Sequence, residues 1–199
     1  MKSDVQKYVK LIESLVPSIS PIESTGTGWA EGLVRGSAQG PTALTMNDPA
    51  SVCVAAWAQL NAFRAGDRSE AGAMGRIVAA QYSNGSFFNL PANLAIEMQT
   101  YYELVLLHAI TSYAVEFHDA AAMQSVARAA DFHVNETQPD HATTQPWAVH
   151  AFVLHPPARS FADQMLHALR TQATGRIDRI SLLLLADAIY CLSRSENDV

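Results

Sequence analysis

The sequence predicts an all-α fold, and three observations support this. Apolar residues recur at helical spacing, as in Val5, Tyr8, Val9 and Ile12, which is typical of an amphipathic helix. No segment shows the period-two alternation between hairpin turns that indicates strands. Hydrophobic residues make up 49% of the 199 residues and charged residues 16%, which favours a compact domain with its own core. We therefore expect a single all-helical domain over residues 1–199.

The N-terminal part, residues 1–47, is expected to hold one amphipathic helix and a long irregular segment. The helix covers residues 3–16 and ends before Pro17, because proline lacks the backbone N–H that a helix interior needs. The segment that follows is rich in Gly, Ser, Thr and Pro, with a short element from Trp29 to Val34. Segments of this kind in compact domains are usually functional or mobile.

The remainder, residues 48–199, is predicted to form helical hairpins. Its first helix begins at Asp48, a residue type that caps free backbone N–H groups, and Pro49 suits the first helical position. Gly66 ends this helix. Short turns join the helices, so sequential helices should pack as antiparallel pairs. The other predicted helices cover residues 69–82, 92–118, 119–134, 144–155, 160–174 and 177–193.

Charge and hydropathy exclude two classes of partner. The net charge is -6 and no basic patch offsets it, so nucleic acid is not an expected partner. The longest apolar stretch, residues 180–192, contains Asp187 and is too short to span a bilayer. The N-terminal helix carries charged residues and does not resemble a signal peptide. We expect neither nucleic-acid nor membrane binding.

Cofactor and redox motifs are also missing from the sequence. The Gly-rich segment at residues 26–40 follows no strand, so it does not match a dinucleotide fingerprint, and no cofactor is expected. Cys53 and Cys191 lie inside apolar helical patterns and are predicted to be buried free thiols. Two such thiols do not suggest a disulfide framework, which favours a reducing, cytoplasmic setting.

The stretch GRIVAAQYSNGSFF, residues 75–88, resembles the repeat motif of terpenoid cyclases and protein prenyltransferases. In that motif an aliphatic helix end leads to Gln, a short polar turn, Gly, any residue and an aromatic, here Gln81, Gly85 and Phe87. Gln81 can cap carbonyls at a helix end, and Gly85 can adopt a positive φ. The resemblance implies an α/α toroid, in which inner and outer helices alternate around a central cavity.

The chain departs from that family in two respects. The Asp-x-Asp-Asp triplet of class II cyclases is absent, and the predicted helices are too few to close a full ring. The cyclase and prenyl-transfer activities therefore do not carry over. Either the toroid is partial, or a partner such as a second copy of the chain completes it.

Carboxylates and aromatic rings at the predicted hairpins favour a site for a small molecule or carbohydrate. Glycoside hydrolysis needs two carboxylates about 5–10 Å apart, and aromatic faces can stack on a sugar. We expect these groups to meet in one cavity. The candidate catalytic residues are Glu97, Glu136 and Asp140, and the candidate ligand-binding residues are Phe87, Tyr101, His141 and Trp147.

Two alternatives remain open. In the first, Tyr101 and Trp147 are core aromatics, Glu97 is a first-turn acid stabilised by the helix dipole, and the chain is a non-catalytic helical-repeat interaction module. In the second, His133 and His141 bind a metal. Metal sites need three or four such groups around the ion, but the spacing is not His-Glu-x-x-His and neither cysteine is near in sequence.

Two polar residues lie in strongly apolar helices. His150 is on an apolar stripe and is predicted to be a hydrogen-bonded core residue. Asp187 must be paired if it is buried, since an unpaired carboxylate would be too costly to keep ionised. Arg176 and Arg179 are too far along the same helix, so we expect a partner on another helix, with a pocket-lining role as the alternative.

Overall fold

The computed structural model describes residues 2–16, 28–36, 44, 47–68, 72–89, 95–137, 143–172 and 177–195. Over these ranges the chain forms nine α-helices and one short 3-10 helix, with no β-strand, which confirms the all-α prediction. The helices are α1 (Lys2–Leu15), α2 (Gly28–Arg35), α3 (Pro49–Arg64), α4 (Ala73–Ala79), α5 (Ile96–Glu116), α6 (Ala120–Glu136), α8 (Val149–Leu154), η1 (Pro156–Ala158), α9 (Arg159–Gln172) and α10 (Arg179–Ser195).

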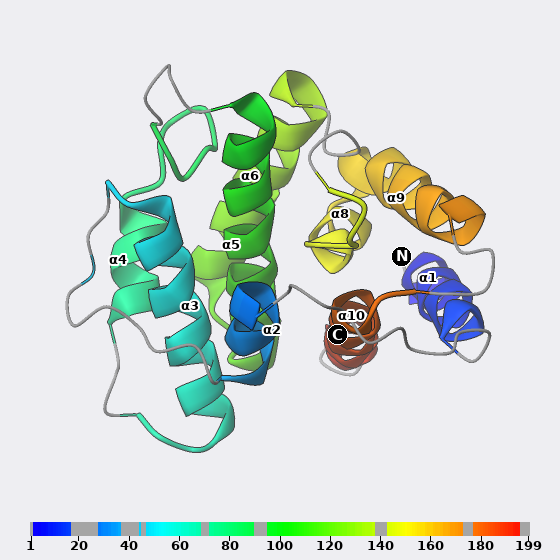
Figure 1. The fold of residues 1–199 in the computed structure, drawn as a ribbon, viewed down its shortest axis with the longest axis horizontal. Coiled ribbons are helices and arrows are strands. Elements are labelled where there is room, and N and C mark those ends of the chain that lie inside the picture. The colour runs from blue at the N-terminus through cyan, green and yellow to red at the C-terminus, as the bar shows by residue number, and fades with distance from the viewer. Residues whose placement is uncertain are drawn as a thin grey trace.

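Helix α5 is the central element of the described part. It packs against α3, α6, α8 and α10, and 14 of its 21 residues are buried. In Figure 1, α3 and α4 lie to one side of α5, and α1, α9 and α10 lie to the other. The apolar residues on several faces of this segment predict such a position, because a helix that is apolar all round is buried.

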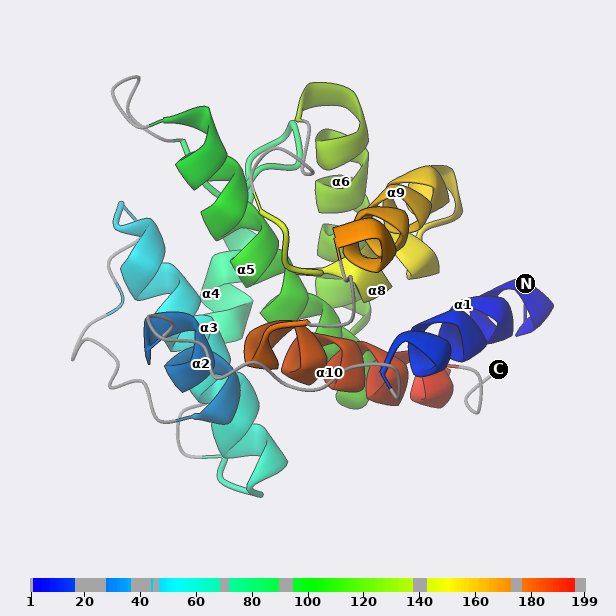
Figure 2. The same cartoon turned by 45° about the vertical axis from the view of Figure 1, so that its right-hand side comes forward.

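Consecutive helices pack on one another as the predicted hairpins require. Helix α3 contacts α4, α5 contacts α6, and α8 contacts α9. Helix α1 packs against α10, so the first and last described helices lie side by side (Figure 2). Helix α5 itself packs against helices that precede it and helices that follow it in the sequence.

The structure confirms the predicted cap at Asp48 and the predicted buried thiols. The Asp48 carboxylate accepts the N–H of Ala50 at 3.2 Å, and Asp119 caps α6 by accepting the N–H of Ala122 at 2.9 Å. Cys53 and Cys191 are buried and free, as predicted. Among the described helices, none is long and apolar enough to cross a membrane.

The segment before α8 differs from the prediction of a helix starting at Thr144. Helix α8 begins at Val149, after Ala148 in the left-handed region at φ 57°. A tight turn replaces the first helical turn, because the Trp147 N–H donates to the Gln145 carbonyl at 2.9 Å. The Trp147 indole N–H donates to the Gln145 side-chain oxygen, also at 2.9 Å, and the ring is fully buried. Burial of this ring decides the local conformation.

The turn at residues 81–88 connects α4 to α6 through one side chain. The Gln81 amide donates to the carbonyls of Gly85 at 2.8 Å and of Ser125 at 3.0 Å, and its oxygen accepts the Ser125 hydroxyl at 2.9 Å. Gln81 therefore ties its own turn to the middle of α6, where the sequence predicts a helix-end cap. Gly85 has φ +97° and Phe87 is buried, both as the motif predicts.

We predict that Gly85→Ala destabilises the fold by about 2 kcal/mol or more. The positive φ is costly for a residue with a Cβ, and that atom would collide with the Arg128 carbonyl oxygen on α6. Gly75→Ala is the control, because Gly75 lies in α4 with open space around its Cα, and helix propensity there favours Ala by up to about 1 kcal/mol. Urea denaturation measures both. Equal stabilities of the two variants would contradict the close approach at Gly85.

Candidate functional site

A charged network surrounds Asp187 of α10, where several helices meet. Arg64, from the end of α3, donates to the Glu116 carboxylate of α5 through Nε at 2.9 Å and through Nη2, and to Asp187 Oδ1 at 2.6 Å. Asp187 Oδ2 is 3.1 Å from His108 Nε2 and 2.6 Å from Ser112 Oγ. The predicted pairing of Asp187 with another helix is thereby confirmed.

The proton positions on His108 follow from its two partners. The Ala148 N–H donates to Nδ1 at 3.0 Å, so Nδ1 carries a lone pair and the ring proton is on Nε2, facing Asp187. Burial lowers the pKa of His108, against the raising effect of Asp187, and the ring is neutral. Burial alone would raise the pKa of Asp187, but the His108 bond and the Arg64 charge hold it below its ordinary value.

The position of the proton on His150 follows from its hydrogen-bond partner, Ser112. The single Ser112 hydroxyl proton goes to Asp187, because an ionised carboxylate can only accept. Ser112 Oγ therefore accepts the Nε2–H of His150 at 3.1 Å, which confirms the prediction of a hydrogen-bonded core histidine. The Nδ1 lone pair of His150 is buried and has no partner among the described residues. Burial holds the pKa of His150 well below its ordinary value.

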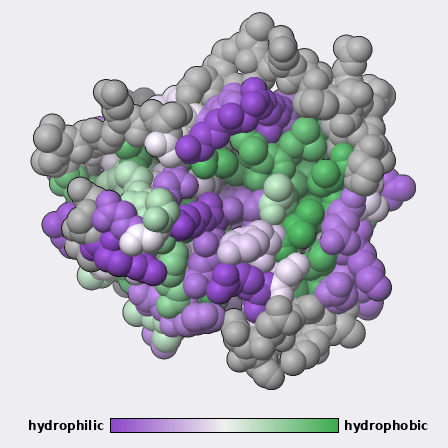
Figure 3. Space-filling view, turned by 90° about the horizontal axis from the view of Figure 1, so that it is seen from below, coloured by the Kyte–Doolittle hydropathy of each residue, from purple (hydrophilic) through white to green (hydrophobic). Residues whose placement is uncertain are grey.

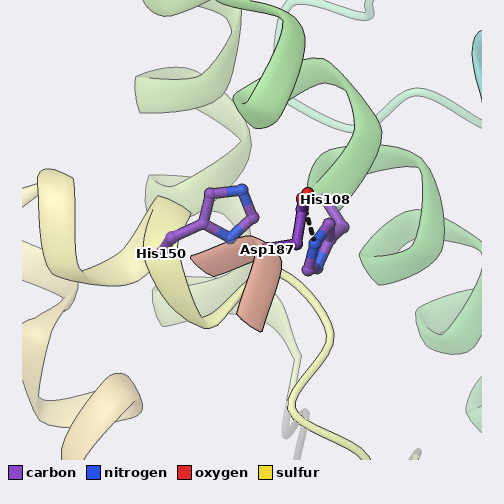
Figure 4. Close-up of side chains that lie close together, drawn as sticks. All are labelled: His108, His150 and Asp187. Carbon is purple, nitrogen blue, oxygen red and sulfur yellow. Dashed lines mark hydrogen bonds and ion pairs between the residues drawn. The ribbon is translucent and has the colours of Figure 1, made fainter. Parts of the chain in front are cut away.

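His108, His150 and Asp187 also have the composition of a metal site. Figure 4 shows Asp187 projecting toward His108 with the His150 ring beside them, and one ligand atom from each lies within 4.8 Å of the others. Both nitrogens of His108 are already engaged, however, and metal binding through one of them would need an anionic ring or a broken Ala148 bond. The Arg64 guanidinium adds a positive charge to the same network. We therefore interpret this network as structural.

A nucleophilic mechanism does not fit this cluster either. In a Ser-His-Asp triad the serine donates to the histidine, which donates to the carboxylate. Here Ser112 donates directly to Asp187 and accepts from His150, and both side chains are fully buried. Cys191 lies nearby, but burial raises the pKa of its thiol, so it stays protonated. The network joins α3, α5, α8 and α10 without presenting a reactive group.

A polar cavity of about 600 Å³ lies on another part of α5. The turn at residues 82–89, the N-terminal half of α5 and the C-terminal end of α6 form its walls. Two carboxylates, Glu103 and Glu136, line it. Its amides and rings come from Asn84, Asn89, Gln99, Tyr82, Phe88 and Phe132.

Glu103 joins this cavity to the motif turn. Its Oε1 accepts the N–H groups of Phe87 and Phe88, each at 2.9 Å, and Oε2 is 3.0 Å from the Phe87 nitrogen. The residue is only 4% exposed, and burial raises its pKa to about 8, although the two backbone N–H groups act in the opposite direction. Glu103 therefore holds the turn in place and puts an acidic group in the cavity wall.

The structure describes five of the seven site residues predicted from the sequence. Glu136 lines the cavity. Phe87 is buried and is not among the lining residues, and its backbone N–H donates to the Glu103 carboxylate. Glu97 is exposed in the first turn of α5. The half-buried Tyr101 packs with its ring centroid 6.2 Å from that of Trp147, and Trp147 packs in turn against His108.

The other two predicted residues, Asp140 and His141, lie outside the described residues, directly after the helix that ends at Glu136. His133, the other histidine of the metal alternative, is fully buried. Its Nδ1 is 2.9 Å from Thr137 Oγ1, and burial lowers its pKa to about 3. Its Nε2 has no partner in the described part of the chain.

Sequence reasoning did not single out Arg64, His108 or Ser112 as site residues. One signal was present for the network: His108, Ser112 and Glu116 recur every four residues, which places them on one face of an otherwise apolar helix. A polar stripe of this kind in a buried helix needs partners from neighbouring helices. No comparable signal exists for Arg64, which ends a helix as many arginines do.

Replacing the central carboxylate tests the network. Asp187→Asn removes the charge that Arg64 and His108 face, and loss of one partner from a buried ion pair costs about 3–5 kcal/mol. Asp131→Asn is the matched control, since Asp131 pairs with His155 at 2.7 Å but its side chain is 55% exposed, and such pairs contribute at most about 1 kcal/mol. Urea denaturation should show a much larger loss for Asp187→Asn, and similar small losses would refute the assignment.

Glu103 should give the fold a distinct pH dependence. Its folded pKa of about 8 lies above the ordinary value of 4.5, so between these values the folded chain keeps a proton that the unfolded chain has lost. This group's contribution to the free energy of unfolding therefore falls as pH rises through that window, by up to about 1.4 kcal/mol per unit. We expect the stability difference between wild type and Glu103→Gln to shrink from pH 5 toward pH 8. Parallel pH profiles would show that Glu103 does not titrate in this range.

Comparison with known proteins gives no guide to function, because no protein-family model, curated protein or solved structure matches this chain.

Proposed function

We propose that this chain is a binding domain for a small hydroxylated ligand, such as a carbohydrate, held in the polar cavity. The observation that carries the proposal is the composition of this cavity. Its volume of about 600 Å³ lies within the range of small-molecule sites, about 300–1,000 Å³. Amides can bond the hydroxyls of such a ligand, and the rings of Phe88 and Phe132 supply apolar faces.

The described geometry favours binding over hydrolysis. Both oxygens of Glu103 accept backbone N–H groups, so this carboxylate is committed to holding the turn. Chemistry on a bound sugar would then need the carboxylates predicted from the sequence, Glu97, Glu136 and Asp140. Of these, Glu136 lines the cavity, and Asp140 follows it closely in the sequence.

The other hypotheses have less support from the structure than the cavity has. The α/α toroid, a cytoplasmic setting and a metal site at His133 and His141 remain predictions from the sequence, and the cavity does not depend on them. The interaction module has one supporting observation: Figure 3 shows apolar side chains gathering on one face, toward the side where α1 and α10 lie. The large apolar side chains exposed in the described part are nevertheless scattered over several helices and the motif turn: Trp29, Tyr82, Ile96, Met98 and Tyr190. We place the cavity first for that reason.

A titration with glucose, followed by amide NMR signals, tests the binding proposal. We expect the signals of residues 82–89 and 99–103 to shift as glucose is added, because these segments form the cavity wall. Asn89→Ala removes an amide from the wall and should weaken binding by about three- to tenfold, as expected for the loss of one hydrogen bond.

The control is Asn135→Ala, since Asn135 is exposed on α6, bonds the Asp131 carbonyl and is not among the residues that line the cavity. This variant should bind as the wild type does. Shifts confined to other parts of the molecule, or equal weakening by both variants, would refute a carbohydrate site in this cavity.

A further inference from the structure

The charge of the polar cavity points to a narrower class of ligand. Resting on the binding function proposed above, we propose that the natural ligand carries a protonated amine in addition to its hydroxyl groups, as an amino sugar does. Glu103 and Glu136 provide the carboxyl groups of the described wall, and no cationic side chain lines it. A small organic cation complements such a cavity, whereas an anion would be repelled by it.

In the described part of the wall, no basic side chain offsets these carboxylates. Neither Lys nor Arg occurs among the described residues that line the cavity. Arg128 lies close in the fold, but its guanidinium is directed to the Gln81 side chain, at 2.5 Å and 3.0 Å.

The two carboxylates differ in burial. Glu103 is 4% exposed at the inner wall, where charge interactions are stronger than in water, and Glu136 is exposed at the end of α6. Acidic groups thus lie both deep in the cavity and at its edge. This arrangement favours a ligand whose amine reaches inward while the rest of the molecule stays near the amides.

Aromatic rings support the same ligand class. Tyr82, Phe88 and Phe132 line the cavity together with the two carboxylates. The faces of such rings attract ammonium groups, by about 0.5–2 kcal/mol according to burial. Rings beside carboxylates bind a cation better than either group does alone, and they offer no comparable advantage to a neutral hydroxyl.

The state of Glu103 is compatible with cation binding. Its oxygens already accept two backbone N–H groups, and each of these bonds favours the ionised form. Burial opposes ionisation and raises the pKa. With a pKa of about 8, Glu103 is mainly protonated at neutral pH when no ligand is bound. A cation in the cavity would shift this balance toward the carboxylate, since opposite charges lower the pKa of an acid.

Four probes separate the possibilities by calorimetric titration at a pH where amines are protonated. Glucose, N-acetylglucosamine and glucosamine differ at one carbon, which carries a hydroxyl, an amide or an ammonium group, and ethanolamine is a hydroxylated amine without a sugar ring. We expect glucosamine to bind about tenfold or more tightly than the two neutral sugars. Added sodium chloride should weaken the binding of glucosamine and leave the binding of glucose unaffected, because only the binding of glucosamine depends on charge.

The variant Glu136→Gln should weaken glucosamine binding several-fold more than it weakens glucose binding, because only glucosamine carries a positive charge. Glu13→Gln is the matched control: it makes the same change of charge at an exposed position on α1, away from the described wall, and should alter neither ligand.

Each outcome decides between the two proposals. Equal affinities for the three sugars overturn the amine inference and leave the carbohydrate site standing. Binding of ethanolamine without any sugar supports the amine inference and overturns the carbohydrate function. Failure of all four probes overturns both, and so does binding that survives in every cavity variant.

Discussion

The ionised carboxylate of Asp187 is the constraint on which the rest of the described fold depends. A buried charge is tolerated only when its partners are in place, and here they come from two other helices: Arg64 of α3, and His108 and Ser112 of α5. Ser112 and His108 extend the network to His150 and Ala148 at the start of α8. Buried ion pairs add little net stability compared with apolar packing. Their effect is to select one relative placement of the helices, because any other leaves a charge or a ring nitrogen without a partner.

The same helix connects this network to the proposed binding site. The C-terminal half of α5 carries His108, Ser112 and Glu116, and its N-terminal half carries Glu103. Fixing the rotation of α5 at one end also fixes the direction of Glu103 at the other, which sets the position of the motif turn through Phe87 and Phe88. A wall held in this way is organised before a ligand arrives, and preorganisation lowers the cost of binding.

Local rules predict much of this fold and little of its site. Helical periodicity, the Asp48 cap and the positive φ of Gly85 depend on neighbours in sequence, and all are found. The need of Asp187 for a partner could be inferred, but the identity of Arg64, 123 residues away, could not. Trp147 is a different case. Its residue type suits a sugar site, but the tertiary packing encloses it beside His108, and this packing cannot be predicted from the sequence. The cavity combines three separate segments, so no single stretch of sequence encodes it.

The pairing of α1 with α10 has a consequence for how the chain folds. The apolar stripe of α1, Val5, Val9, Ile12 and Leu15, is buried in the finished structure, largely against helices from the other end of the sequence. The Tyr8 hydroxyl donates to the carbonyl of Arg159, 151 residues later. During synthesis α1 emerges before its partners α8 and α10, so the stripe is exposed to solvent and to other chains until they follow. Contacts of such long separation also slow folding relative to bundles built from local pairs. We therefore expect α1 to be the part of the nascent chain that chaperones protect.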